Sequence, residues 1–149
     1  MHCILRALAV GAAVAAGAAA GASAQTPSIL DLKGTWTGSA EMIVEGTTPH
    51  NPGHAESQPA GKYRLRTELL TFKFDGQEGR RIWGSLSSKH ATEQRIIGSI
   101  SIDGKWVYMV GRASFIDLEV ANADTLRGCA RHVTASSALV SCYDLKRQK

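Results

Sequence analysis

The sequence contains few of the residues that carry covalent chemistry or enforce rigid turns. Of its 149 residues, three are cysteine and four are proline, and no proline follows Pro59. It has no Gly-x-Ser-x-Gly segment, which would mark a nucleophile elbow. No stretch sustains the apolar period of a helix. A helical bundle and an α/β-type serine hydrolase are therefore not expected.

The longest apolar run lies near the amino terminus and is too short for a membrane span. Arg6 precedes a stretch of Ala, Val and Gly from Ala7 to Ala20, whereas a spanning helix needs roughly 20 strongly apolar residues. Ala22-Ser23-Ala24 is a small-x-small cleavage motif. We predict a bacterial-type signal peptide over residues 1–24, a mature chain from Gln25 without a membrane span, and a periplasmic or secreted location.

Net charge is also small. The chain has 17 Lys and Arg against 13 Asp and Glu, and Arg6 lies in the predicted signal, so the mature chain has a net charge of +3 when histidine is neutral. Its basic residues are dispersed apart from Arg80-Arg81 and the tail from Lys146 to Lys149. Nucleic acid is therefore not an expected partner.

Two cysteines remain after Cys3 is removed with the signal. In an oxidising compartment Cys129 and Cys142 should pair. A turn centred on Ala135-Ser136 places them directly opposite each other, at a separation that a disulfide can bridge. The pattern predicts one disulfide that locks the last hairpin, with Arg127 opposite Asp144 and Leu126 opposite Leu145.

Short apolar runs, separated by turn residues at roughly ten-residue spacing, predict an all-β fold. A mature chain of 125 residues fits one domain, residues 25–149. Turns at Asp75-Gly76 with Gly79, and at Asp103-Gly104, indicate consecutive hairpins. The expected strands are Gly34–Glu45, Tyr63–Leu65 continuing through Leu69–Phe74, Arg80–Ser87, Gln94–Ile102, Lys105–Gly111, Phe115–Val120, Thr125–Val133 and Leu139–Lys146.

The segment Gly34-Thr35-Trp36 resembles the Gly-x-Trp opening of the calycin barrels, which include lipocalins and avidins. In that group the tryptophan plugs one end of the barrel and a basic residue at the end of the last strand packs over its ring. The resemblance implies a single eight-stranded antiparallel up-and-down barrel, with Trp36 as the plug and Arg147 or Lys146 as its partner. Neither the second lipocalin motif nor the avidin biotin site is present, so neither ligand carries over.

The Asp103-Gly104 hairpin has two distinct faces. A two-residue turn pairs Ile100 with Val107 and Gly98 with Met109, on the face that also carries Ile102. Aromatic rings beside small residues suit a cavity, so we predict that the other face, together with Trp83, lines the lumen. If that face points outward, the aliphatic face fills the barrel and the aromatic face suits a protein partner. The predicted lumen residues are Trp83, Ser99, Ser101, Trp106 and Tyr108.

The segment from Gly46 to Gly61 holds three of the four prolines and reads as a long loop. His50, His54 and Glu56 lie in it at spacings that suit zinc. A solvated loop explains the same residues, and metal ligands normally need rigid supports. We therefore expect no metal and no other cofactor.

These patterns favour a non-enzymatic exported carrier that binds a small apolar or amphipathic molecule. The alternative is an exported inhibitor or envelope module that interacts with another protein through the Gly46 to Gly61 loop. An enzyme ranks third because no catalytic constellation is found.

Overall fold

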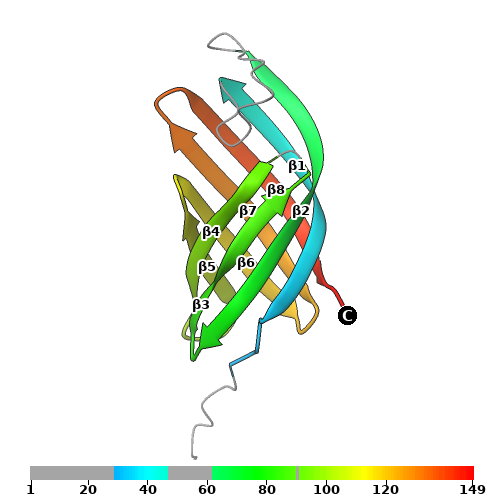
Figure 1. The fold of residues 1–149 in the computed structure, drawn as a ribbon, viewed down its shortest axis with the longest axis vertical. Helices are drawn as coiled ribbons and strands as arrows, with labels where there is room; N and C mark the ends of the chain where they lie inside the picture. The colour runs from blue at the N-terminus through cyan, green and yellow to red at the C-terminus, as the bar shows by residue number, and fades with distance from the viewer. Residues whose placement is uncertain (1–28, 47–61, 90) are drawn as a thin grey trace, which may run out of the picture.

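Buried and more exposed residues alternate along most of eight segments, and each segment forms a strand. The computed structural model describes residues 29–46, 62–89 and 91–149 (Figure 1). The predicted signal peptide and the loop residues His50, His54 and Glu56 lie outside these ranges. The strands are β1 Gly34–Gly46, β2 Tyr63–Glu78, β3 Arg81–Ser88, β4 Ala91–Ile100, β5 Trp106–Gly111, β6 Ser114–Asn122, β7 Thr125–Thr134 and β8 Ser137–Arg147.

Each strand pairs antiparallel with the next, and β8 pairs with β1 to close the sheet. This confirms the predicted eight-stranded antiparallel barrel. Within the described ranges, no helix is long and apolar enough to cross a membrane.

The strand register sets the width of the barrel. A row of paired residues that starts at Phe74 on β2 passes once around the barrel and returns to β2 at Arg64, ten residues earlier. Eight strands with this stagger give a tilt of about 40° and a backbone diameter of about 16 Å, from ordinary strand spacings. A barrel of this width is either filled by side chains or holds one small molecule.

The core fills the barrel at the end where the described chain begins. Trp36 and Phe72 are fully buried, and Leu32 closes this end from the segment before β1. Further inward side chains come from β2 to β8: Phe74, Ile82, Ile96, Ile100, Val107, Met109, Ile116, Leu118, Leu126, Ala130, Tyr143 and Leu145.

Two glycines allow the sheet to curve into a closed barrel. A Cβ on Gly84 would overlap the carbonyl oxygen of Lys73, and one on Gly128 would overlap that of Asp117. Lys73 lies on β2, which is next to the β3 strand of Gly84, and Asp117 lies on β6, which is next to the β7 strand of Gly128. Only glycine permits so close an approach of adjacent strands, as corners of small barrels require.

The predicted turn is confirmed at Gly79 but not at Asp75-Gly76. β2 continues to Glu78, and the chain turns at Gly79-Arg80 instead. The register of β2 against β3 shifts between Phe74 and Gly76. Asp75 and Gly76 therefore form a β-bulge within β2 and not a turn.

The predicted register of the Asp103-Gly104 hairpin is confirmed for Ile100 with Val107 and for Gly98 with Met109. The ladder stops there, because Gly104 takes a left-handed φ of 74° in a longer turn from Ser101 to Lys105. Ile102 lies in that turn and is 81 % exposed, so it does not continue the aliphatic face of the hairpin to which the two-residue turn assigned it.

The last hairpin follows the prediction in full. Cys129 faces Cys142, Arg127 faces Asp144 and Leu126 faces Leu145. The two cysteines form a disulfide whose Cα atoms are 4.0 Å apart. Because the neighbouring positions Ala130 and Tyr143 point into the core, the disulfide lies on the outer face of the barrel.

Candidate functional site

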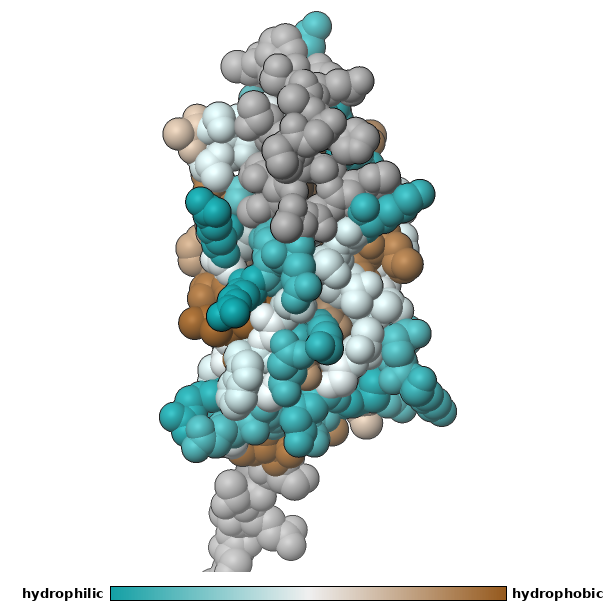
Figure 2. Space-filling model, viewed as in Figure 1, coloured by the Kyte–Doolittle hydropathy of each residue, from teal (hydrophilic) through white to brown (hydrophobic). Residues whose placement is uncertain are grey.

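The aromatic residues predicted to line the lumen lie on the outer face instead. Trp83, Trp106 and Tyr108 are exposed, whereas Val107 and Met109, which alternate with them on β5, are buried. The lumen assignment is therefore wrong, and the aliphatic face of the hairpin fills the barrel. Figure 2 shows hydrophobic side chains on the outer surface between hydrophilic ones.

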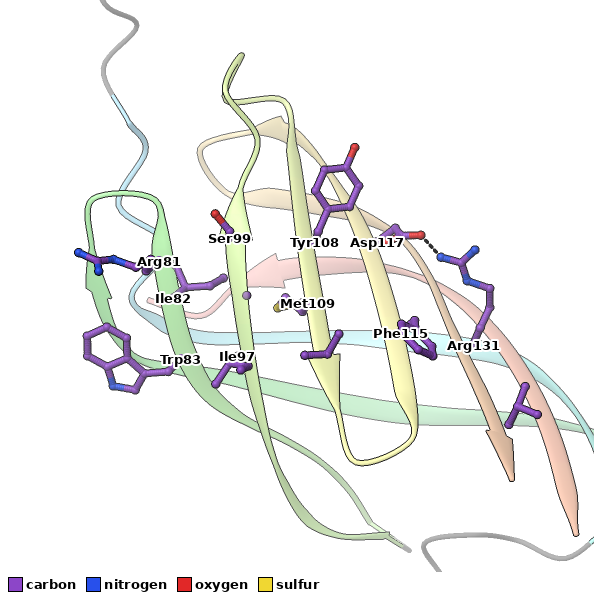
Figure 3. Close-up of a pocket in the computed structure, with 13 residues that line it drawn as sticks. Arg81, Ile82, Trp83, Ile97, Ser99, Tyr108, Met109, Phe115, Asp117 and Arg131 are labelled. Atoms are coloured by element: carbon purple, nitrogen blue, oxygen red, sulfur yellow. Dashed lines mark hydrogen bonds and ion pairs between the residues drawn. The ribbon is translucent and has the colours of Figure 1, made fainter. Parts of the chain in front are cut away.

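Neighbouring strands bring these outward aromatic residues together with aliphatic ones. Trp83 pairs with Ile97, Ile97 with Val110, and Val110 with Phe115. All four side chains are exposed, Ile97 by 62 %. They line a groove of about 840 Å³ that also includes Tyr108 and Val133 (Figure 3). We call this surface the aromatic groove.

The position of the Trp83 ring is fixed by the strand beside it. A Cβ on Gly76 would overlap the indole of Trp83, so the ring lies directly against the backbone of β2. Gly76, which lies in the bulge at Asp75-Gly76, has no side chain and so leaves room for the indole. The indole is therefore supported on one side and 45 % exposed.

Charged side chains lie at the two ends of the groove. Arg81 lies at the β3 end, where its Nη2 atom is 3.2 Å from Oε1 of Glu78. At the other end Arg131 of β7 pairs with Asp117 of β6, as the dashed line in Figure 3 marks. Both pairs are largely exposed to solvent, so their charges are available to a polar group on a bound molecule.

The remaining predicted residues divide between the groove and its margin. Ser99 is exposed and lines the groove. Ser101 does not: its hydroxyl donates to Asp103 at 2.5 Å and accepts from the backbone N–H of Trp106. The Ser101 bond, followed by the Lys105 backbone N–H, lowers the pKa of Asp103. The ring of Trp106 stacks on that of Tyr108, with centroids 6.5 Å apart.

Sequence reasoning missed most of the aliphatic half of the groove. Ile97 and Val110 each directly follow another apolar residue, so the sequence does not show which of the two faces outward, and Val133 lies alone between polar residues. Only the pairing of β3 to β7 places them side by side. Extending the Asp103-Gly104 register further along the same hairpin would have revealed part of the row, because Val110 then falls opposite Ile97.

The closed end has the arrangement that the resemblance implies. The guanidinium carbon of Arg147 lies 4.3 Å from the ring centre of Trp36. Arg147 also donates to the carbonyls of Lys33 and Asp31, each at 2.7 Å. The indole N–H of Trp36 donates to the carbonyl of Leu32 at 2.9 Å. The predicted basic partner is thus Arg147.

Polar side chains gather on the inner wall at the opposite end of the barrel. Arg66 lies 3.5 Å from Glu68, which also accepts a hydrogen bond from Ser88 at 2.9 Å. Ser114 and Nδ1 of His132 are 3.0 Å apart in a buried pair. Burial lowers the pKa of His132. Burial, and secondarily the charge of Asp117, raises the pKa of Tyr143.

No metal centre is found in the part of the chain that the structure describes, since no three His, Cys, Asp or Glu side chains are grouped there. The weak candidates His50, His54 and Glu56 fall outside that part. Their role as ligands remains a prediction.

Comparison with known proteins gives little further guidance. No family model and no curated protein matches the chain. The chain is similar in structure to an S-type phycobiliprotein lyase, CPES, from Guillardia theta, with 12 % sequence identity and a TM-score of 0.38. The match covers 79 % of this chain and 89 % of the lyase.

A lyase is an enzyme, and this finding contradicts the prediction that the protein is not one. That prediction is withdrawn. At a TM-score of 0.38 the likeness carries no argument about the activity of this chain.

Proposed function

We propose that the protein is an exported calycin-type barrel that binds a small apolar or amphipathic molecule in the aromatic groove. The groove itself carries the proposal: about 840 Å³ lined by Trp83, Tyr108, Phe115 and aliphatic side chains. Small-molecule sites have this size and a mostly apolar lining with a few polar groups. The charged pairs at the two ends would orient a molecule with a polar part.

Export is supported by the Arg6 and Ala-rich start of the chain, with its Ala22-Ser23-Ala24 motif. The Cys129–Cys142 disulfide also supports it, because disulfides persist in oxidising compartments. Calycin type is supported by the Gly34-Thr35-Trp36 motif and by the Arg147 side chain over the Trp36 ring.

The groove can be tested with the amphipathic dye 1-anilinonaphthalene-8-sulfonate. We expect saturable dye fluorescence and quenching of tryptophan emission, since Trp83 lines the groove and Trp106 adjoins it through Tyr108. Ile97→Ser should weaken dye binding several-fold. The matched control is Leu69→Ser, because Leu69 is also 62 % exposed but lies on β2 away from the groove. Equal dye affinity in the two variants would remove the groove as the site.

A second candidate function is docking of a protein partner, and the exposure of Phe115 and Ile97 favours it. A photoreactive benzoylphenylalanine in place of Phe115 should then crosslink a partner in exported material. The crosslink should disappear in Ile97→Ser and persist in Leu69→Ser. Saturable dye binding without such a crosslink would leave the small molecule as the ligand.

A further inference from the structure

The row of outward side chains that lines the aromatic groove continues beyond the groove. Phe115 pairs with Arg131 on β7, and Arg131 pairs with Val140 on β8. Val140 pairs with Ile43 on β1, which pairs with Leu65 on β2. Every apolar member of the row is exposed, and Arg131 is its one charged member. We call the whole row the apolar strip: Trp83, Ile97, Val110, Phe115, Arg131, Val140, Ile43 and Leu65.

The strip has a hollow on each side of Arg131. One is the aromatic groove, and the other is a cleft of about 520 Å³ whose lining includes Val140, Ile43 and Leu65. The strip crosses all eight strands and is therefore about 34 Å long at the ordinary strand spacing. An acyl chain spans about 15 Å, half of the hydrocarbon core of a bilayer. Each arm of the strip thus has about the length of one acyl chain.

The strip is narrow along most of its length. Glu41 and Glu45 are the next outward residues on either side of Ile43, and Arg95 and Ser99 have the same positions beside Ile97. A row one side chain wide that passes round a barrel cannot lie against a flat surface over its whole length. Extended hydrocarbon chains fit it better than a membrane surface or the broad face of a globular protein.

Two arginines lie beside the arm that forms the aromatic groove. Ile96 pairs with Gly111, and Arg95 and Arg112 are the next residues beyond this pair. Both side chains are exposed, and neither forms an ion pair with a described residue. Like charges so placed on neighbouring strands repel each other. An anion between them would relieve that repulsion.

The acids near these arginines leave a positive charge at the middle of the strip. Asp117 pairs with Arg131 through one nitrogen of the guanidinium, which has five N–H donors in all. Glu93 shares the outer face of β4 with Arg95, so the charge of Arg112 remains. The far arm instead carries the two acids beside Ile43. An anionic group is therefore favoured at the middle of the strip and disfavoured at its far arm.

We propose that the apolar strip binds one molecule of a two-chain anionic phospholipid, with its phosphate near Arg95, Arg112 and Arg131 and one acyl chain along each arm. Guanidinium groups bind phosphate through paired hydrogen bonds. One chain occupies the aromatic groove, and the other passes Arg131 into the second cleft. The inference rests on the proposed function, because one of the two arms is the aromatic groove itself.

Calorimetric titration of the mature protein with water-soluble dioctanoyl phosphatidylglycerol tests the strip. Val140→Ser should weaken lipid binding several-fold, because it removes apolar contact in the second cleft. It should leave binding of the anilinonaphthalene dye unchanged, since Val140 does not line the aromatic groove. Leu69→Ser is the matched control and should bind the lipid with wild-type affinity. Ile97→Ser should weaken the binding of both dye and lipid.

The head-group contact is tested with zwitterionic dioctanoyl phosphatidylcholine. Wild type should prefer phosphatidylglycerol, because the choline ammonium group is repelled by Arg95 and Arg112. The double variant Arg95→Gln/Arg112→Gln should lose that preference. All the substituted side chains are exposed, and circular dichroism establishes that each variant is folded.

Failure of the proposed function and failure of this inference are separate results. Equal dye affinity in Ile97→Ser and Leu69→Ser removes the groove as a site. If Ile97→Ser weakens dye binding but Val140→Ser binds phosphatidylglycerol as well as Leu69→Ser does, the groove stands and the two-chain ligand is overturned. The inference is also overturned if phosphatidylglycerol does not bind or binds only as vesicles, if phosphatidylcholine binds wild type equally well, or if the double variant keeps the preference.

Discussion

The indole of Trp83 on β3 rests on Gly76 of β2, where any side chain would overlap it. Gly76→Ala should therefore displace the indole without breaking the barrel, because the ring can move outward. We expect red-shifted tryptophan emission and weaker binding of the anilinonaphthalene dye. Gly104→Asn is the control, since Gly104 has open space around it and asparagine tolerates its left-handed φ. Unchanged emission in Gly76→Ala would contradict the packing described.

Gly128→Ala should destabilise the barrel as a whole. The added methyl group meets the carbonyl oxygen of Asp117 on the neighbouring backbone, which cannot move aside as a side chain can. We expect a loss of about 1–3 kcal/mol in the free energy of unfolding, as for other overpacked interiors. Urea unfolding measures it, and Gly104→Asn again serves as the control. Wild-type stability would mean that the strands are not held this close.

Removing the disulfide with Cys129→Ala and Cys142→Ala together should lower the free energy of unfolding by about 2–4 kcal/mol. The closed loop is short, with a sequence separation of 13 residues, and the two strands are already paired. Urea unfolding of the double variant, compared with oxidised wild type, gives the value, and reduced wild type should behave like the double variant. Free thiols in unreduced exported protein would argue against the bond.

Arg147→Ala should destabilise the closed end by about 2 kcal/mol, because it removes the stacking on Trp36, three hydrogen bonds to backbone carbonyls and an ion pair with Asp124. Arg147→Lys should recover part of the loss. Arg127→Ala, which breaks an exposed pair with Asp144 at 3.4 Å, should cost well under 1 kcal/mol. Equal losses in Arg147→Ala and Arg127→Ala would show that the stacking contributes nothing.

Stability should fall below about pH 6.5 through His132. Burial lowers its pKa in the folded protein, so protons bind the unfolded chain first as the pH drops below the unfolded value of about 6.5. The stabilising effect is complete above that pH and is lost as the pH falls toward the folded pKa. Urea unfolding at pH 7.5 and 5.5 should show a smaller difference in His132→Gln than in wild type. An equal difference would assign the pH dependence to other groups.

The sequence was sufficient to predict the features that depend on pairing between strands that follow one another in the chain. The turn at Ala135-Ser136 fixes the register of β7 and β8, so Cys129 and Cys142 had to meet. The Gly34-Thr35-Trp36 motif likewise indicated the closed end. Which face of the β4–β5 hairpin points into the barrel was not predictable in this way, because both faces carry large apolar residues. Strand alternation separates those two sides, but only closure of the whole barrel decides which one faces inward.

The contact between Trp36 and Arg147 also constrains how the chain folds. More than 100 residues separate the two, and β1 lacks its second neighbour until β8 is present. Such long-range closure makes folding slow compared with local hairpin formation. A chain still emerging from the ribosome has no last strand and cannot close the barrel. For a protein that we propose to be exported, this delay keeps the chain unfolded for translocation until its final residues are made.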